Sequence, residues 1–424
     1  MRVLVVTQYF WPESFRINEV VRSLHEAGAE VTVLTGKPNY PEGVWFEGYR
    51  GAGIHRERYH GIEVLRVPMR ARGRADGLRL ALNYLSFAAS GSLLAPWLLR
   101  RQRFDVVFVY AISPVTQAFV ALAMKAVHRV PVVLWVQDLW PQSLQATGFV
   151  KSPLLLAPVG WMVRFLYRFS DLLLVQSRAF VDEVARLADR GKVVYHPNPG
   201  ERAPDGDPGS GAPPFPFAPG FNVVFAGNLG TAQAVPTLLA AAERLRGRSD
   251  IRFVLVGAGS LGGWLREEVA RRGLANVQLP GRFPPETMPA VYARASVLLV
   301  SLAGGDAFRL TVPSKVQAYL AAGRPLLAAL DGEGARVVEE AGAGLCVTAE
   351  DADALADAVL RMAAMPPEAL AAMGARGRAY HLEHFAPERL ARRLLELFGR
   401  VARPGVAPPH PVGGTPDRDP PEVR

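Results

Sequence analysis

Cysteine is nearly absent from this sequence. The only one is Cys346, which excludes internal disulfide bridges and cysteine-rich metal sites and fits a reducing compartment. Cys346 lies in the apolar run GLCVTA, so we expect a thiol buried in a core, not a nucleophile. The histidines are scattered, and neither His128 nor His196 suggests a cluster of metal ligands.

Several catalytic and targeting motifs are also missing. The chain contains no G-x-S-x-G and no Walker A motif. Its first residues, MRVLVVTQYF, lack the long apolar core and cleavage site of a signal peptide and predict a first strand. The acids of EDADAL (350–355) resemble a D-x-D metal motif, but they open a predicted helix, where acids suit the helix dipole. We therefore expect no metal site and no cofactor.

Lysine is scarce as well. The net charge of +9 is carried almost entirely by arginine, and the lysines are Lys37, Lys125, Lys151, Lys192 and Lys315. Basic charge suits nucleic acid, anionic lipid or phosphorylated substrates. The sequence has no basic motif interleaved with aromatic residues, so we expect no nucleic-acid partner.

What the chain does have is a repeated strand–helix pattern. Its 424 residues suggest two domains. Apolar runs, hydrophobic on both faces as in a covered parallel sheet, alternate with helical patterns such as 16–27 and 178–190. The predicted strands are 2–6, 30–34, 62–67, 105–110, 131–136, 171–176, 221–227, 251–257, 276–281, 295–301, 325–330 and 344–348. This is the pattern of doubly wound α/β sheets.

A Pro/Gly-rich stretch, PNPGERAPDGDPGSGAPPFPFAPG, separates two such halves and reads as a linker. The expected order is an N-terminal domain, a linker, a C-terminal domain, a helix and a disordered tail, over residues 1–196, 197–220, 221–384, 385–402 and 403–424. Ligands of such folds bind beyond the carboxyl ends of the strands, here in a cleft that the two domains face.

One turn in the second half combines a helix start with a cation. In RLTVPSKVQAYLAAGRPLLAAL (309–330), Pro313 and Ser314 suit a helix start and Gly323 its end. Lys315 is unexpected there, because the positive end of the helix dipole favours anions. Either the lysine is solvated, or an external anion meets it.

A second turn follows another strand of the same half. Gly227 and Asn228 belong to the turn GNLG, whose small residues let backbone amides approach a phosphate. Two such turns at one sheet edge suggest a diphosphate. The frame G-x-G-x-x-G at Gly257, Gly259 and Gly262 is a weak dinucleotide match, because no acid stands about 20 residues later.

The segment Leu78 to Leu99 is long and apolar, with basic flanks. Its pattern leaves three alternatives open: a core helix, a helix lying on an anionic membrane surface, and a membrane span, for which about 20 mostly apolar residues are needed.

Six motifs occur along the chain in an order that resembles the pattern of a known family. They are MRVLVVTQYFWPESFRINEVVRSLHEAGAEVTVLTG, VQDLWPQSL, FAGNLGTAQ, VLVGAGS, GRFPPETMPAVYARASVLLVSL and PSKVQAYLAAGRPLLAAL. Over about residues 1–400 the chain resembles family 4 glycosyltransferases of the GT-B fold, especially the branch that builds O-antigen, colanic-acid and capsular sugars. The resemblance implies two Rossmann-like domains, a nucleotide-sugar donor in the second, an acceptor in the first, and a retaining, metal-independent transfer.

The resemblance also implies roles for single residues. The donor diphosphate would meet Gly227, Asn228, Ser314 and Lys315. The nucleobase would lie beside Gly281, Arg282 and Phe283, and Arg16 would reach the phosphates. Glu13 and Asp138 are candidates for contacts to the sugar or the acceptor hydroxyl, although Asp138 could instead be a loop cap.

The chain departs from the family pattern at several positions. Many relatives carry two glutamates where this chain has Leu310 and Ala318, so the ribose contact is missing unless Gln317 replaces it. Gln137 stands where many relatives have histidine, and Asn228 and Gln233 stand where they have arginine and lysine.

The leading hypothesis is a cytoplasmic glycosyltransferase, peripheral to the inner face of the membrane. It would transfer sugar from a UDP donor to a lipid-linked or polysaccharide acceptor of a cell-surface glycan. The alternatives are a UDP-sugar 2-epimerase of the same fold and a non-catalytic protein that binds nucleotide sugars.

Overall fold

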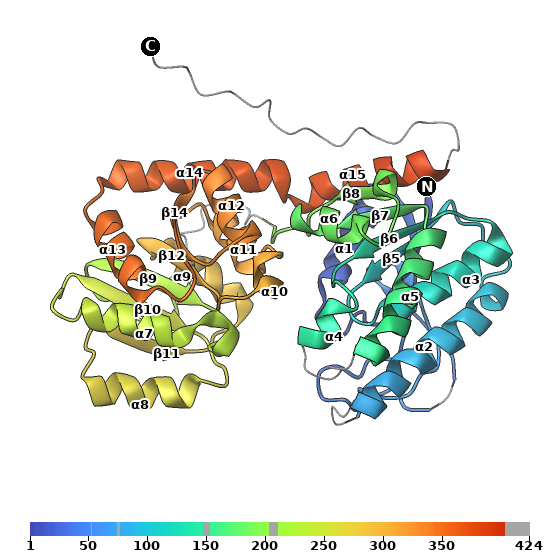
Figure 1. Cartoon of the computed structure of the whole chain (residues 1–424), viewed down its shortest axis with the longest axis horizontal. Coiled ribbons are helices and arrows are strands. Elements are labelled where there is room, and N and C mark those ends of the chain that lie inside the picture. Colours follow the sequence, from blue (N-terminus) through green and yellow to red (C-terminus); the bar gives the residue numbers. More distant parts are fainter. Residues whose placement is uncertain (52, 74–76, 147–152, 203–210, 403–424) are drawn as a thin grey trace, which may run out of the picture. The chain divides into compact units, whose positions relative to one another are not determined.

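A computed structural model describes residues 1–51, 53–73, 77–146, 153–202 and 211–402 (Figure 1). The chain forms two compact units: unit 1 contains Met1–His196 and the residues from Ala391 on, and unit 2 contains Pro197–Leu390. The predicted disordered tail, 403–424, lies outside the described residues, as does part of the predicted linker.

The described strands of unit 1 form an eight-stranded sheet of order β3-β4-β2-β1-β5-β6-β7-β8, parallel except for the hairpin β3–β4. The strands are β1 (Arg2–Val6), β2 (Glu30–Thr35), β3 (His55–Tyr59), β4 (Ile62–Arg66), β5 (Val106–Ala111), β6 (Val132–Val136), β7 (Leu172–Val175) and β8 (Val193–Tyr195). The helices are α1 (Arg16–Glu26), α2 (Gly77–Leu98), α3 (Ala118–His128), α4 (Gln142–Ala146), α5 (Pro153–Phe169) and α6 (Ala179–Ala185).

The structure confirms every predicted strand run of this half and adds two edge strands, β3 and β8. The β3 sequence, HRERY, is polar, because an edge strand does not need an apolar face. It is joined to β4 by a tight turn in which His60 and Gly61 have φ of 47° and 83°.

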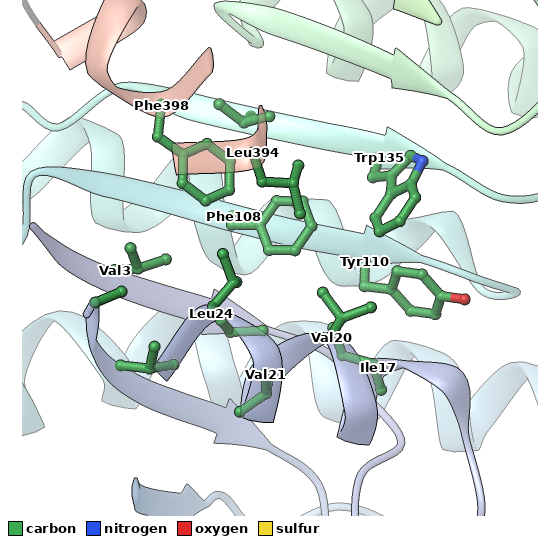
Figure 2. Close-up of a cluster of buried hydrophobic side chains, with 14 of the residues drawn as sticks. Val3, Ile17, Val20, Val21, Leu24, Phe108, Tyr110, Trp135, Leu394 and Phe398 are labelled. Atoms are coloured by element: carbon green, nitrogen blue, oxygen red, sulfur yellow. The ribbon is translucent and has the colours of Figure 1, made fainter. Parts of the chain in front are cut away.

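The core of unit 1 contains residues from both ends of the chain. Helix α15 (Pro387–Ala402) packs its apolar face against the sheet, with the rings of Phe398 and Phe108 5.1 Å apart (Figure 2). On the same face, α1 contributes Ile17, Val20, Val21 and Leu24. The last described helix therefore completes the core that the first strand begins.

Unit 2 holds a parallel six-stranded sheet of order β11-β10-β9-β12-β13-β14 among its described residues. The strands are β9 (Phe221–Ala226), β10 (Ile251–Val256), β11 (Val277–Gly281), β12 (Val297–Ser301), β13 (Leu326–Ala329) and β14 (Gly344–Val347). The helices are α7 (Val235–Arg244), α8 (Gly262–Arg272), α9 (Met288–Ala293), α10 (Asp306–Arg309), α11 (Ser314–Ala322), α12 (Glu333–Glu340), α13 (Ala352–Ala363) and α14 (Pro367–His384).

Each sheet reverses its strand order at one point. In unit 1 the reversal separates β1 from β5, and in unit 2 it separates β9 from β12. Ligands of doubly wound sheets bind beyond the carboxyl ends of the strands at such points. A ligand is therefore expected at the loops after β1 and β9.

Helix α2 covers the long apolar segment for which the sequence left three alternatives open. Within the described residues, no helix has both the length and the apolar character needed to cross a membrane.

Candidate functional site

Lys315 is the most unusual charged group in the described part of unit 2. Its side chain extends from the first turn of α11, and its Nζ lies 3.9 Å from the centre of the Phe225 ring. Nζ is buried and has no hydrogen-bond partner among the described residues. Burial lowers the pKa of Lys315 to about 8. Burying an unpaired ammonium is costly, so an arriving anion would recover much of this energy.

Gly227 makes room for this ammonium. It follows β9 directly, and a Cβ at this position would lie 2.4 Å from Cε and 2.9 Å from Nζ of Lys315. Its φ of 139° lies in a region that favours glycine. The two turns that the sequence singled out, at Gly227 and Lys315, are thus in direct contact.

Two glycines after β10 let their loop pack on the loop after β9. A Cβ on Gly257 would lie 1.8 Å from the carbonyl oxygen of Gly227, and one on Gly259 would lie 2.4 Å from that of Leu229. The Leu229 amide donates to Ala258 across the same contact, at 2.9 Å. Part of the G-x-G-x-x-G frame therefore serves the packing of two loops. This agrees with the absence of a downstream acid, which made a dinucleotide site a weak match.

The remaining polar residues near these turns are mostly engaged with protein. Asn228 donates through Nδ2 to Oε1 of Gln233 at 3.0 Å. Ser314 is the first residue of α11 and is exposed, but no side chain caps this helix; Pro313 occupies the cap position. The capping that the sequence suggested for serine is therefore absent.

Gln317 has a structural partner where the sequence suggested a ribose contact. It is buried, and its Nε2 donates to the carbonyl oxygen of Asn198 at 2.8 Å. This bond ties α11 to the segment that enters unit 2. One N–H of the Gln317 amide is therefore taken by backbone, and the ribose contact suggested for this residue stays a prediction.

The residues predicted to lie beside a nucleobase are at the carboxyl end of β11. Gly281 has a φ of 95° and accepts a hydrogen bond from the Gly257 amide at 2.8 Å. Arg282 is exposed, whereas Phe283 is half-buried and its ring is stacked 5.3 Å from that of Phe215. The neighbouring loops of unit 2 therefore bring Gly281, Gly257 and Gly227 into one connected backbone surface.

In unit 1, Glu13 holds loops together. It is buried, and its Oε1 accepts hydrogen bonds from the amides of Asn39 and Tyr40 at 2.8 and 2.7 Å, while Oε2 accepts one from Phe10 at 3.3 Å. Burial raises the pKa of Glu13 to about 7, against the lowering effect of these amides. Its carboxylate joins the loop after β1 to the loop after β2, which is a scaffolding task.

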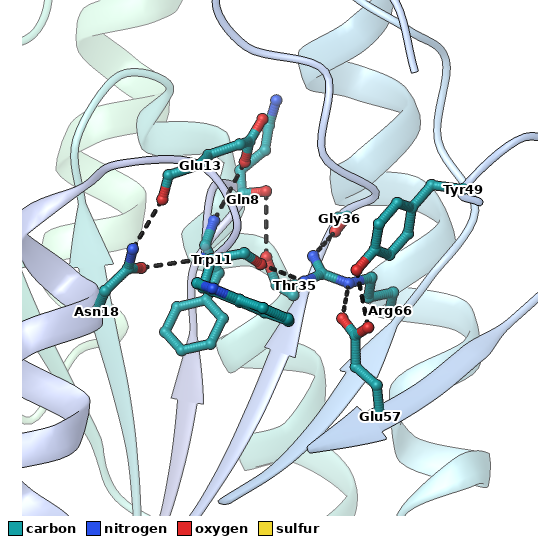
Figure 3. A network of polar contacts seen from close by, with 10 residues as sticks. Gln8, Trp11, Glu13, Asn18, Thr35, Gly36, Tyr49, Glu57 and Arg66 are labelled. Atoms are coloured by element: carbon teal, nitrogen blue, oxygen red, sulfur yellow. Dashed lines mark hydrogen bonds and ion pairs between the residues drawn. The ribbon is translucent and has the colours of Figure 1, made fainter. Parts of the chain in front are cut away.

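A second buried charge fastens the same loop. Arg66 is fully buried; it pairs with Glu57 and donates to the carbonyl oxygens of Gly36 and Trp11 (Figure 3). From the other side, Asn18 accepts from the Trp11 amide at 3.0 Å and donates to the carbonyl oxygen of Glu13 at 2.7 Å. The backbone between β1 and α1 is therefore held rigidly.

Asp138 and Arg16 also lie at this edge of unit 1. Asp138 follows β6 and accepts hydrogen bonds from the amide and hydroxyl of Ser113, at 2.7 and 2.8 Å. Arg16 opens α1 and lies 3.8 Å from Glu19. Both charges act on Tyr110, whose pKa is raised by burial, and so both lie in its surroundings.

The sequence pattern did not predict a role in the site for Phe225, whose ring lies against the Lys315 ammonium. Cation–aromatic contacts of this kind stabilise a partly desolvated ammonium. The residue was part of a predicted core strand, and nothing in its pattern distinguishes an aromatic ring that also meets a cation.

The described residues contain no cluster of three or more His, Cys, Asp or Glu arranged to hold a metal ion. Asp351 of the D-x-D-like stretch caps α13 by accepting from the Ala354 amide at 2.9 Å, as its position before a helix predicted. Cys346 lies in β14, and burial raises the pKa of its thiol to about 12.

Two family matches cover both units. Residues 14–199 match the family described as "Glycosyl transferase 4-like domain", and residues 220–365 match the family described as "Glycosyl transferases group 1". The chain belongs to the group 1 glycosyltransferases. This confirms the family resemblance that the ordered motifs indicated.

Two relatives of this glycosyltransferase come from Pseudomonas aeruginosa and Escherichia coli. "Probable glycosyltransferase WbjE" of Pseudomonas aeruginosa is 28% identical over 53% of this chain and 58% of its own length. The match thus spans somewhat over half of that relative. "Putative colanic acid biosynthesis glycosyl transferase WcaI" of Escherichia coli is 26% identical over 76% of this chain and 82% of its own.

Solved structures show the fold of this glycosyltransferase. HepE of Anabaena in complex with UDP has a TM-score of 0.67 at 15% identity and covers 94% of this chain and 100% of its own. Sucrose-phosphate synthase of Thermosynechococcus elongatus has a TM-score of 0.66 at 17% identity, covering 94% of this chain and 98% of its own. These likenesses confirm the predicted GT-B fold with its two Rossmann-like domains.

Proposed function

We propose that this glycosyltransferase moves a sugar from a nucleotide-diphosphate donor, a UDP-sugar, onto a lipid-linked or polysaccharide acceptor of a cell-surface glycan such as an O-antigen. The observation that carries the proposal is the buried ammonium of Lys315, which contacts Gly227 and Phe225 and has no hydrogen-bond partner among the described residues. A diphosphate is the ligand that would satisfy it.

Three further features support a diphosphate at this point. Gly227 and Asn228 lie where the sheet of unit 2 reverses its strand order, and the N-terminus of α11 adds backbone amides without a side-chain cap and a favourable dipole. The HepE structure similar to this chain contains UDP. We place the nucleobase beside Gly281, Arg282 and Phe283, and assign Arg16 to the phosphates.

The same ammonium has a role in the chemistry. When the bond between the sugar and the diphosphate breaks, negative charge builds on the departing nucleotide. A fixed cation in a site of low dielectric stabilises this charge without rearranging. We therefore assign Lys315 as the group that lets the transfer proceed without a metal, with retention of configuration.

The acceptor would be bound by unit 1. Asp138 is the candidate for the acceptor hydroxyl, because its carboxylate is fixed by Ser113 and its side chain is only half-buried. We assign Glu13 an indirect part through the loops that it joins. The relative WcaI, named for colanic acid biosynthesis, supports a glycan acceptor. A lipid-linked acceptor places the enzyme at the inner face of the membrane.

The test combines binding with turnover. We expect calorimetry to show 1:1 binding of UDP to the full chain, and mass spectrometry to show release of nucleotide from one UDP-sugar when a polyprenyl-diphosphate-linked saccharide is added. Lys315→Ala should abolish both, whereas Lys192→Ala in unit 1 should abolish neither. UDP binding that is unchanged in Lys315→Ala would refute the proposal.

The same experiment separates the alternatives. Conversion of the donor to an isomer without any acceptor would indicate a UDP-sugar 2-epimerase. UDP binding without turnover, over a full set of donors and acceptors, would indicate a non-catalytic protein.

A further inference from the structure

Three helices of unit 1 form a continuous layer. Figure 1 shows α2, α3 and α5 side by side. Lys125 of α3 donates to the carbonyl oxygen of Phe169 on α5 at 2.9 Å, and the rings of Phe119 and Phe165 stack at 6.2 Å. A ring nitrogen of His128 lies 3.3 Å from the carbonyl oxygen of Pro96 on α2. The layer covers the sheet through α3, which contacts β5 and β6.

The outward face of α2 is apolar along its length. The residues that recur every four positions on this face are exposed, and they are Ala81, Leu85, Ala89, Leu93 and Trp97. The side chain of Leu93 is 78% exposed and that of Trp97 is 60% exposed. An ordinary surface helix presents polar residues to water, so this face is arranged for an apolar contact.

Helix α5 repeats the arrangement and adds charge. Trp161, Phe165 and Phe169 recur every four residues and are exposed, Trp161 by 74%. Beside them stand Arg164 and Arg168, also exposed. A row of aromatic residues bordered by arginines is typical of a helix that lies in a membrane interface.

The charge of this region is mainly positive. Between residues 77 and 170 the only acids are Asp105 and Asp138. Asp105 accepts from the Arg2 amide and Asp138 from Ser113, so both serve loops at strand ends. The cations of the same stretch among the described residues are Arg79, Arg100, Arg101, Arg103, Lys125, Arg129, Arg164 and Arg168, of which Lys125 is paired at 2.6 Å with Asp171, just after α5.

We propose that the exposed face of α2, α3 and α5 docks on an anionic lipid bilayer. The face is basic and apolar, as an anionic headgroup layer over acyl chains requires, and none of the described helices could span the bilayer instead. A second copy of the chain is a poorer occupant, because its equally basic face would repel this one. The inference rests on the proposed function for its purpose, the reach of a lipid-linked acceptor.

The test measures binding without donor or acceptor. The full chain is sedimented with vesicles of phosphatidylglycerol and phosphatidylethanolamine, or of phosphatidylcholine alone, at about 0.1 M salt, where the Debye length is about 10 Å. We expect partitioning into the anionic vesicles. Leu93→Ser with Trp161→Ser should weaken it about tenfold or more through lost apolar burial. Arg164→Gln and Arg168→Gln should each weaken it about fivefold, and only for anionic vesicles.

Matched controls come from unit 2. Leu382→Ser removes an exposed leucine of α14, and Arg266→Gln removes an exposed arginine of α8; both should leave vesicle binding unchanged. Equal binding to both kinds of vesicle, or equal losses in the surface and control variants, would overturn the proposal. A dimer that the Leu93 and Trp161 changes dissociate, with no vesicle binding, would overturn it in favour of a second copy.

The two proposals fail separately. If the chain binds vesicles but not UDP, the donor assignment is wrong and the docking surface stands. If the chain binds UDP and the surface variants bind vesicles as well as the unmodified chain does, the docking surface is wrong and the donor site stands.

Discussion

The two units fasten the loops at the carboxyl ends of their strands in different ways. Unit 1 uses buried side chains, Arg66 and Glu13 above all, and each has several partners. Unit 2 uses backbone contacts that Gly257 and Gly259 permit, and it leaves the ammonium of Lys315 without a hydrogen bond in the described part of the chain.

This difference shows how a buried charge can be interpreted. Arg66 is even more deeply buried than Lys315, yet its donors are taken up by Glu57 and by backbone carbonyls. A buried charge that has hydrogen-bond partners in the protein helps to hold the fold together. A buried charge without such partners favours the binding of a ligand of opposite charge. The presence or absence of hydrogen-bond partners, more than the degree of burial, distinguishes the candidate binding site from the scaffold.

The largest expected effect is on the scaffold. Arg66→Met leaves Glu57 and the carbonyls of Gly36 and Trp11 without their donor, and we expect unfolding in urea to show a loss of about 3–5 kcal/mol. Arg56→Met is the control, since Arg56 is an exposed arginine paired with Glu63, and should cost under about 1 kcal/mol. Similar losses for both would mean that the buried network is not what fastens the loop.

Lys315→Met should have opposite effects on function and stability. Turnover should fall at least about a hundredfold, because the leaving diphosphate loses its fixed cation. The urea midpoint of unit 2 should rise, because the low pKa of Lys315 shows that its charge destabilises the ligand-free fold. Lys192→Met should change neither quantity. A variant that is both inactive and less stable would show that Lys315 serves the architecture after all.

Gly227→Ala tests the contact between the two turns. The added methyl group would lie 2.4 Å from Cε of Lys315, at a backbone φ of 139° that side chains avoid. We expect the Kd for UDP to rise about tenfold or more, which corresponds to at least about 1.4 kcal/mol. At Gly247 a Cβ would meet nothing within 4 Å, so Gly247→Ala should bind UDP normally. Equal affinities of the two variants would separate Gly227 from the binding site.

The smallest expected effect is the pH dependence of UDP binding. Below its pKa of about 8 Lys315 is charged and can hold the diphosphate; above it the charge is lost. Calorimetry should therefore show affinity falling about fivefold between pH 8 and 9. In Lys315→Met the affinity should be low and show no such fall over this interval.

The same pKa predicts a stability change of defined sign. Between pH 8 and 10.5 the unfolded chain holds a proton at Lys315 that the folded chain has released. Unit 2 should thus gain stability from this group as pH rises through this window, a gain that Lys315→Met lacks. The higher stability predicted for Lys315→Met should therefore shrink as pH rises from 8 to 10.5. A stability difference that widens over this interval would contradict the assignment.

The sequence predicted the interior of both sheets well, because strands buried on both faces leave long apolar runs. It missed β3, whose polar sequence HRERY has no such run, and β8, which has only three residues. It predicted a final helix over 385–402 but not that the helix packs against β5, since the contact between Phe398 and Phe108 joins distant parts of the chain.

The candidate site was predictable where it depends on loops that follow strands. The contact between Gly227 and Lys315 follows from two such loops at one sheet edge. The tasks of Glu13 and Gln317 were not predictable, because each side chain bonds backbone groups of a loop that only the tertiary structure brings near. Hydrogen-bond partners of this kind leave no local pattern in a sequence.

The helix that closes the first core also orders events during synthesis. Phe398 and Leu394 leave the ribosome only after all of unit 2 has been made, yet they form part of the interior that Val3 and Val5 begin. Domains otherwise tend to fold from the N-terminus as they emerge. The core of unit 1 therefore cannot be completed until the last helix has been synthesised. A fragment ending at His196 would expose to water the interior face that this helix covers.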